Sequence, residues 1–175
     1  AATFSNEQLE QIVAPIALYP DSLLTQVMMG STYPLEIVEA DRWVKQNNSL
    51  KGSALESALK DKSWDPSVKS LCTLPDVLAK MSENLDWTQD LGDAFLGQKT
   101  QLMDAVQRMR GKAYEAGNLT TTEHQVVTQQ PEKIIVIEQG RRRVVRVLDQ
   151  QLGRADRQLV DEAIAVLLRH RRVHE

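Results

Sequence analysis

Aromatic and acidic residues stand beside prolines at three places in the first half of the chain: Tyr19-Pro20-Asp21, Tyr33-Pro34 and Trp64-Asp65-Pro66. Tyrosine and tryptophan combine an apolar ring with a polar tip, which suits them to contact sugars and peptides. Pro15 and Pro20 restrict the segment around Tyr19, so a fixed orientation of this side chain requires packing or a ligand. We therefore predict a binding surface on the connecting segments, made by Tyr19, Asp21, Tyr33, Trp43, Trp64 and Asp65.

The same residues also have a purely structural interpretation. Asp21 and Asp65 precede helical patterns and can cap them, because a side-chain oxygen accepts a hydrogen bond from a free backbone N–H in the first turn. Trp43 and Trp64 can anchor a core while their indole N–H groups find acceptors. The sequence leaves the binding and the structural interpretations open.

Catalytic and metal-binding patterns are scarce in this sequence. Residues 1–123 contain no histidine, so this part of the chain offers no histidine-based triad. His170 and His174 are four residues apart, but the arginines around them disfavour a bound cation. No phosphate-binding loop, dinucleotide motif or HExxH motif occurs. We predict no catalytic residue, no metal and no cofactor.

Charge divides the chain at about residue 140. Residues 1–140 carry twelve Lys and Arg against nineteen Asp and Glu, whereas residues 141–175 carry nine arginines against five acids. These arginines fit non-specific attraction to anions better than base readout, so we predict no specific nucleic-acid partner. No apolar run approaches the roughly 20 residues of a membrane span, so none is expected. Cys72 stands alone among apolar neighbours and is expected in the core.

One apolar stripe recurs at helical spacing from residue 85 to residue 117, which predicts a single long helix. Asp86 and Gln89 can form a capping box at its start, and Gly117 can end it. Such a helix would be roughly 45 Å long and would need several shorter elements to cover it. Gly92 and Gly97 are its weak points, unless they allow close helix approach. The stripe consists of Trp87, Leu91, Phe95, Leu102, Val106, Met109 and Ala113.

Six short helices are predicted before residue 85, the first capped by Ser5 with Gln8. The predicted fold is mainly α, with several short helices packed around the long one, a small β-hairpin at about 133–148 and a C-terminal helix. The predicted domains are a helical domain at 4–117, a polar linker at 118–132, and an appendage at 133–175 that combines the hairpin and the last helix. The exposed hairpin edge offers a route to a homodimer through the C-terminal segment.

Three stretches also resemble a known family. They are APIALYPDSLLTQVMMGSTYPLEIVEADRWV, WDPSVKSL, and LDWTQDLGDAFLGQKTQLMDAVQRMRGKA followed by EAGNL. Together they resemble domain-of-unknown-function family 3300, over about residues 4–138. The resemblance implies an exported protein of the Gram-negative envelope with a helical N-terminal domain, and it implies no activity. Residues 139–175 depart from the family pattern, as a divergent end or a non-native reading frame would.

The start AATFSNEQ is typical of the mature side of a signal-peptide cleavage site, so the protein is expected in the periplasm or otherwise exported. The predicted function is a non-catalytic binding or structural module whose partner is a protein or an envelope polymer. The alternative is a carboxylate-dependent hydrolase acting on an envelope polymer, with Asp21, Asp65 or Asp86 in the reaction. Its minimal signature is two carboxyl groups about 5–9 Å apart in a cleft.

Overall fold

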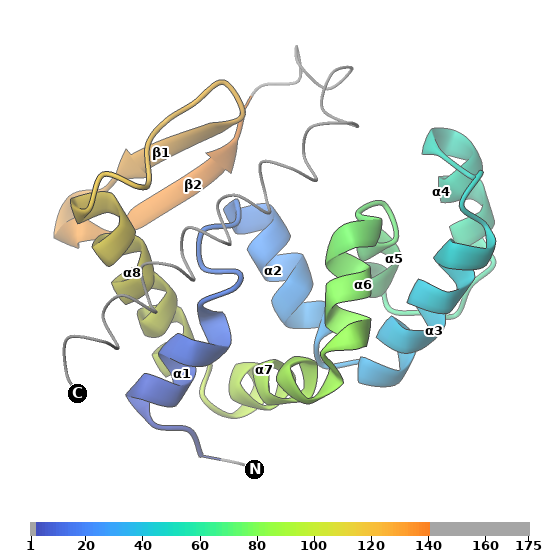
Figure 1. The fold of residues 1–175 in the computed structure, drawn as a ribbon, viewed down its shortest axis with the longest axis horizontal. Helices are drawn as coiled ribbons and strands as arrows, with labels where there is room; N and C mark the ends of the chain where they lie inside the picture. Colours follow the sequence, from blue (N-terminus) through green and yellow to red (C-terminus); the bar gives the residue numbers. More distant parts are fainter. Residues whose placement is uncertain (1–2, 141–175) are drawn as a thin grey trace. The chain divides into compact units, whose positions relative to one another are not determined.

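Helices dominate residues 3–140, the part of the chain that the computed structural model describes (Figure 1). Two short antiparallel strands complete this part, so the prediction of a mainly α fold with a small β-hairpin is confirmed. None of the helices within these residues is both long and apolar enough to cross a bilayer. The helices are α1 (Asn6–Val13), α2 (Asp21–Gly30), α3 (Pro34–Gln46), α4 (Gly52–Lys60), α5 (Pro66–Leu71), α6 (Pro75–Glu83), α7 (Leu85–Gly97) and α8 (Lys99–Glu115).

The chain divides into two compact units. The helical unit is Thr25–Gln98 and holds the end of α2 with α3 to α7. The hairpin unit joins Thr3–Leu24 to the described residues from Lys99 onward, and holds α1, the start of α2, α8 and both strands. The predicted C-terminal helix and the second half of the predicted hairpin fall after Gly140, outside the described residues.

The single helix predicted over residues 85–117 is wrong, because the structure has two helices there. α7 ends at Gly97, Gln98 leaves helical geometry with φ −137° and ψ 41°, and α8 begins at Lys99. Glycine favours such an end, because it costs about 1 kcal/mol inside a helix. The predicted apolar stripe is buried, but its two halves belong to different units, since Leu91 is buried in the helical unit and Leu102 in the hairpin unit.

Gly92 stays inside α7 and allows a close approach to the chain that enters α3. A Cβ atom at this position would lie 2.5 Å from the backbone oxygen of Ser31 and 3.3 Å from the Cα of Thr32. The glycine therefore allows a close approach, but the neighbour is the turn before α3 and not another helix as expected. Gly111, in the middle of α8, would place its Cβ in open space. Both glycines lie within helices, but a side chain would clash with the backbone at Gly92 and would meet open space at Gly111.

The core of the helical unit forms where α3 packs against α5, α6 and α7. α3 contributes Ile37 and Ala40, both fully buried. Buried Thr88 donates a hydrogen bond from its hydroxyl to the carbonyl of Met81 at 2.8 Å, which ties the start of α7 to α6. The other apolar side chains of this unit with no exposed surface include Val27, Val68, Leu71, Leu78, Met81, Leu91 and Ala94.

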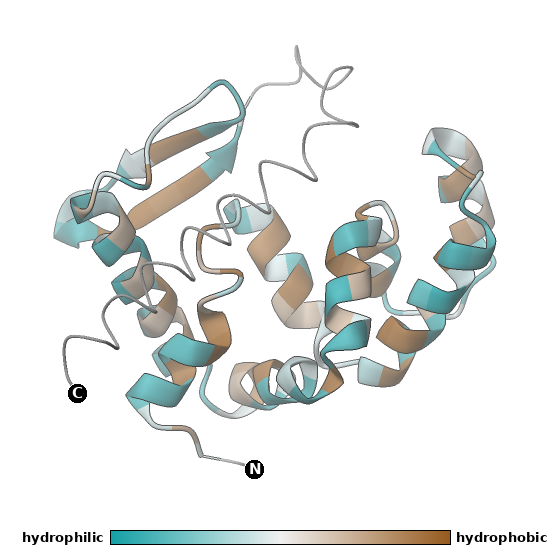
Figure 2. Cartoon of the chain, viewed as in Figure 1, coloured by the Kyte–Doolittle hydropathy of each residue, from teal (hydrophilic) through white to brown (hydrophobic). Residues whose placement is uncertain are grey.

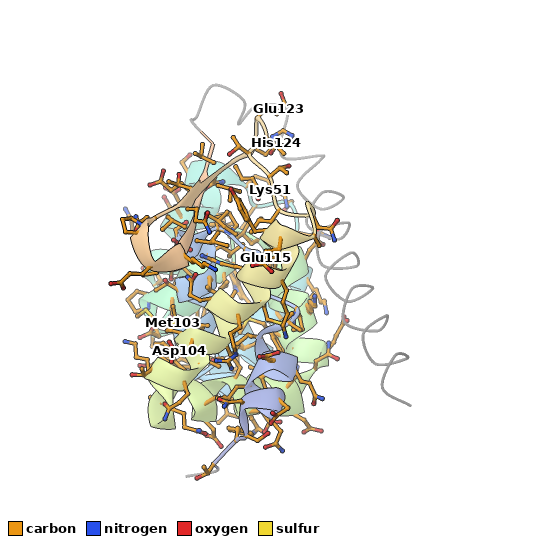
Figure 3. All side chains as sticks on the ribbon, turned by 90° about the vertical axis from the view of Figure 1, so that its left-hand side faces the viewer. Lys51, Met103, Asp104, Glu115, Glu123 and His124 are labelled. Atoms are coloured by element: carbon orange, nitrogen blue, oxygen red, sulfur yellow. The ribbon has the colours of Figure 1, made fainter. Side chains whose placement is uncertain are left out.

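In the hairpin unit, α1 packs on α8. α1 begins with the predicted capping box, because Ser5 accepts from the Gln8 backbone and Gln8 accepts from the Ser5 backbone. Glu10 accepts from Arg108 Nε and from Lys112 Nζ, each at 2.6 Å, so two ion pairs join the helices. Figure 3 labels Met103 and Asp104 on the outer side of α8.

The hairpin lies earlier in the chain than predicted. Strand β1 (Gln125–Gln129) falls inside the predicted polar linker 118–132, and it pairs with β2 (Ile135–Gln139). The sequence QVVTQ is polar enough to resemble a linker, yet it pairs with β2 as a strand, with Gln125 buried and Val127 partly buried on one face. Figure 2 shows the hydrophobic middle of both strands. The hairpin core consists of Leu18, Ala113, Leu119, Ile135 and Ile137.

Side chains cover parts of both hairpin edges. The Gln107 amide accepts from Ile135 N–H at 2.9 Å and donates to its carbonyl at 3.1 Å, as a neighbouring strand would. On the other edge, Thr121 Oγ1 accepts from Val127 N–H at 3.0 Å and donates to its carbonyl at 3.2 Å. An unpaired edge invites pairing with another chain, so these contacts protect the hairpin.

Candidate functional site

The six predicted site residues fall into two groups. Tyr33, Trp43, Trp64 and Asp65 lie in the helical unit, where they form a connected set with Glu36, Glu39 and Lys62. Tyr19 and Asp21 lie in the hairpin unit and surround Arg110. We call the seven residues of the helical unit the aromatic–acidic surface: Tyr33, Glu36, Glu39, Trp43, Lys62, Trp64 and Asp65.

Helix α3 supplies one side of the aromatic–acidic surface. Tyr33 precedes Pro34, whose fixed φ suits the first helical position. Glu36, Glu39 and Trp43 follow at steps of three, three and four residues, which places the four side chains along one helical face. Tyr33 is 41% exposed and Trp43 is half-buried, so this face reaches solvent.

The segment before α5 supplies the other side, and carboxylates of α3 hold it in place. Glu36 accepts from the backbone N–H of Asp65 at 2.6 Å. Glu39 accepts from the indole N–H of Trp64 at 3.2 Å. Asp65 caps α5 as predicted, because its carboxylate accepts from the N–H of Ser67 at 2.9 Å.

The charge of Asp65 is stabilised by its neighbours. The hydroxyl of Ser67 donates to this carboxylate, and with the Ser67 N–H and the Tyr33 hydroxyl it holds the pKa of Asp65 below its ordinary value, against a smaller opposing effect of burial. The negative charge of Asp65 raises the pKa of Tyr33. At neutral pH Asp65 is therefore an ionised acceptor beside a neutral phenol. A general acid requires the opposite shift, a carboxyl pKa raised toward the working pH.

The two tryptophans of this surface contact each other. Their ring centroids are 5.9 Å apart and the rings meet edge to face at 74°. Trp64 is nearly buried at 9% exposure, so the structural interpretation of a core anchor fits it. Trp43 is the more accessible partner. The ammonium of Lys62 lies 4.8 Å from the Trp43 centroid and 5.3 Å from that of Trp64.

Tyr19 and Asp21 help to hold a buried arginine. Arg110 on α8 is 1% exposed and donates to the carbonyls of Ala17 at 2.8 Å, Tyr19 at 3.0 Å and Ile135 at 2.9 Å. Its Nη1 also lies 2.6 Å from Asp21 Oδ1. Burial lowers the pKa of Arg110, and Asp21 opposes that shift. Because Tyr19 itself is only 5% exposed, this segment is built into the hairpin unit.

Four participants were missed in the sequence: Glu36, Glu39, Lys62 and Arg110. The two glutamates had a signal, since they share the helical stripe of Tyr33 and Trp43. Arg110 also had one, because it lies four residues after Val106 and three before Ala113, on the apolar stripe. No sequence signal indicated Lys62, since its contact with Trp43 and Trp64 depends on how the loop after α4 returns to α3.

Two other predictions concern residues with possible reactivity. Cys72 is buried as expected, and burial raises the pKa of its thiol to about 11, which keeps it protonated and unreactive at neutral pH. Within residues 3–140, no group of three or more His, Cys, Asp or Glu side chains is arranged to hold a metal ion.

Glu123 and His124 precede β1 and are labelled in Figure 3. His124 Nε2 lies 3.2 Å from Glu123 Oε1.

Comparison with known proteins places the chain in a family without an assigned role. Residues 5–150 match the family described as a protein of unknown function, DUF3300. The uncharacterised protein YacH of Escherichia coli K12 is 48% identical over 128 residues, which cover 73% of this chain and 21% of that relative. The chain therefore spans about one fifth of the length of this relative. No solved structure matches.

Proposed function

Since the chain belongs to the DUF3300 family of proteins of unknown function, we propose a role from its own geometry: a non-catalytic module that binds a partner through the aromatic–acidic surface. The observation that carries the proposal is the exposure of Tyr33 and the partial exposure of Trp43 on a scaffold fixed by hydrogen bonds. Side chains on a rigid helix lose little freedom when a ligand binds, which favours affinity. The partner is a protein or an envelope polymer.

The carboxylates of this surface favour binding over hydrolysis. A glycoside hydrolase needs one carboxyl that is protonated near neutral pH. Asp65 has a lowered pKa, and Glu36 and Glu39 already accept hydrogen bonds from Asp65 N–H and from Trp64. Asp21, another candidate, is an ion-pair partner of Arg110. Carboxylates held in these hydrogen bonds and this ion pair act as fixed acceptors and are poorly suited to proton transfer.

An experiment with isolated peptidoglycan sacculi and with a periplasmic protein extract separates the two functions. The purified chain is incubated with each fraction, and retained chain and released soluble fragments are both measured over time. We expect saturable retention with no release of fragments, and loss of most retention in Trp43→Ala. Fragments released by the natural chain but not by Asp65→Asn would support the hydrolase instead. Absence of saturable retention on both fractions would overturn the proposal.

The proposed location is the periplasm or another exported compartment. Its support is the resemblance of residues 4–138 to exported envelope proteins. The test is fractionation of cells that express the complete natural gene, with a cytoplasmic enzyme as the marker. We expect the protein in the periplasmic or envelope fraction, and recovery with the cytoplasmic marker would contradict this part of the proposal.

A further inference from the structure

Lys62 is unusual among the lysines of the helical unit because aromatic rings hold its ammonium. The nitrogen lies within the range of a cation–π contact with both Trp43 and Trp64, at 4.8 and 5.3 Å from their centroids. Within residues 3–140, no carboxylate oxygen comes within ion-pair distance of it. Lys45, in contrast, pairs with Asp41 at 2.9 Å. The two tryptophans thus already bind one alkylammonium group, which the chain itself supplies.

The surroundings of the two rings favour a cation. Glu39 is fixed to the Trp64 indole, and Glu36 is fixed to the backbone of Asp65. With Asp65 they bring three carboxylates to a surface where Lys62 is the one basic member. Negative charge beside the negative faces of aromatic rings strengthens attraction for an ammonium group, as in aromatic cages.

Lys62 is a displaceable occupant. Its ammonium ends a flexible stem of four carbons, is strongly hydrated, and is held by the rings without an ion pair in the described residues. Trp43 is only half-buried, so solvent reaches part of the residue that Lys62 approaches more closely. A ligand cation can therefore take the place of the lysine when the stem rotates away.

We propose that Trp43 and Trp64 form a recognition site for an alkylammonium group of the ligand, and that Lys62 occupies this site in the free protein. The inference rests on the proposed function, because it names the chemistry that the aromatic–acidic surface recognises. The ligand group is a quaternary ammonium or a primary ammonium on an alkyl chain. Lys62 then acts as an internal competitor that sets the affinity.

The probes are choline and Nα-acetyl-lysine amide, which distinguish quaternary from primary ammonium, with 3,3-dimethylbutan-1-ol as the neutral analogue of choline. Each is titrated into the full chain labelled with ¹⁵N, and the three indole N–H resonances are followed by NMR. We expect saturable shifts for Trp43 and Trp64 with at least one cationic probe and no comparable shift with the alcohol. Trp87 on α7 serves as the internal reference.

Variants test the role of Lys62. Removal of the competitor in Lys62→Ala is expected to tighten binding of the cation by a factor of roughly two to five, the equivalent of one exposed cation–π contact. Lys62→Arg keeps a cation in place and is expected to give no tightening. Lys60→Ala, at the exposed end of α4, is the matched control for loss of one positive charge and is expected to leave the affinity unchanged. Trp43→Ala is expected to abolish the saturable shift.

Several results would overturn the inference. These are equal shifts with choline and the neutral alcohol, no saturable shift with either cation, unchanged affinity in Lys62→Ala, or equal tightening in Lys60→Ala. If the cations fail but retention on an envelope fraction still depends on Trp43, the ammonium claim falls and the proposed function stands. If the cations bind but the chain is not retained on either envelope fraction, the proposed function is refuted and the ammonium site stands.

Discussion

The aromatic–acidic surface and the Arg110 contacts are both charged networks, but the cation at the centre of the second is buried, although the side chain of its partner Asp21 is 46% exposed. Arg110 has a side chain that is 2% exposed, and its guanidinium contacts three carbonyls and one carboxylate. Tyr33 is 41% exposed, and Trp43 is half-buried. A buried ion whose donors are all hydrogen-bonded cannot bind a ligand as well, whereas aromatic rings that solvent reaches can still contact one. Accessibility of the central side chains, more than residue type, therefore separates a structural network from a binding surface.

The largest expected effect is on stability, from Arg110→Met. The change keeps much of the side-chain volume but removes the arginine donor from the carbonyls of Ala17 and Tyr19. The carbonyl of Ile135 loses one of its two donors and keeps Gln107. Loss of one partner from such a network is expected to lower the free energy of unfolding by about 3 kcal/mol. Urea unfolding followed by circular dichroism measures it. A loss below about 1 kcal/mol would mean that the arginine is no more structural than a surface residue.

The second prediction compares two helical glycines. Gly92→Ala places a Cβ 2.5 Å from the backbone oxygen of Ser31, which cannot rotate away, and is expected to destabilise the protein by about 2 kcal/mol. Gly111→Ala meets open space and is expected to stabilise by about 0.5–1 kcal/mol through helix propensity. The urea midpoints should move in opposite directions. A Gly92→Ala variant that is as stable as the natural protein, or more stable, would refute the close packing at Gly92, and a destabilised Gly111→Ala would refute the open surroundings of Gly111.

The smallest effect concerns the pH dependence of Asp65. Because the folded carboxyl has a pKa below its ordinary value of 3.8, the charge stabilises the fold above that pH. This contribution disappears as the pH falls through 3.8 toward the lower folded pKa. Asp65→Asn keeps a capping side chain, so it should cost less than about 1 kcal/mol at pH 7. The difference in unfolding free energy between the two proteins should shrink from pH 7 to pH 3, and a constant difference would contradict the assignment.

The local part of the fold was predictable from the sequence because local signals decide it. Ser5 with Gln8 and Asp65 before Pro66 begin helices where their patterns indicate. Gly97 was named as a weak point, but a continuous helix was predicted across it, because the apolar stripe continues in phase. Only the tertiary division shows that the two halves of the stripe serve different cores. Strand β1 escaped detection for a related reason, because its polar residues become a strand through pairing with β2.

The candidate site was predictable in part. Tyr33, Trp43, Trp64 and Asp65 were named from their types and come together in one unit. Tyr19 and Asp21 were grouped with them because they have the same aromatic, proline and acidic character, yet they surround Arg110. Residue type indicates what a side chain can contact, but the partner depends on where the chain returns, and no local pattern encodes that.

The most direct test of binding through the aromatic–acidic surface uses two tyrosines of equal exposure. Tyr33 is 41% exposed at the start of α3, and Tyr114 is 40% exposed near the end of α8. Retention on the envelope fractions and the urea midpoint are measured on the same samples of Tyr33→Ala and Tyr114→Ala. We expect at least a tenfold loss of affinity for Tyr33→Ala, about 1.4 kcal/mol or more, and none for Tyr114→Ala, with both proteins folded. Equal retention by the two folded variants, or a loss confined to Tyr114→Ala, would contradict it.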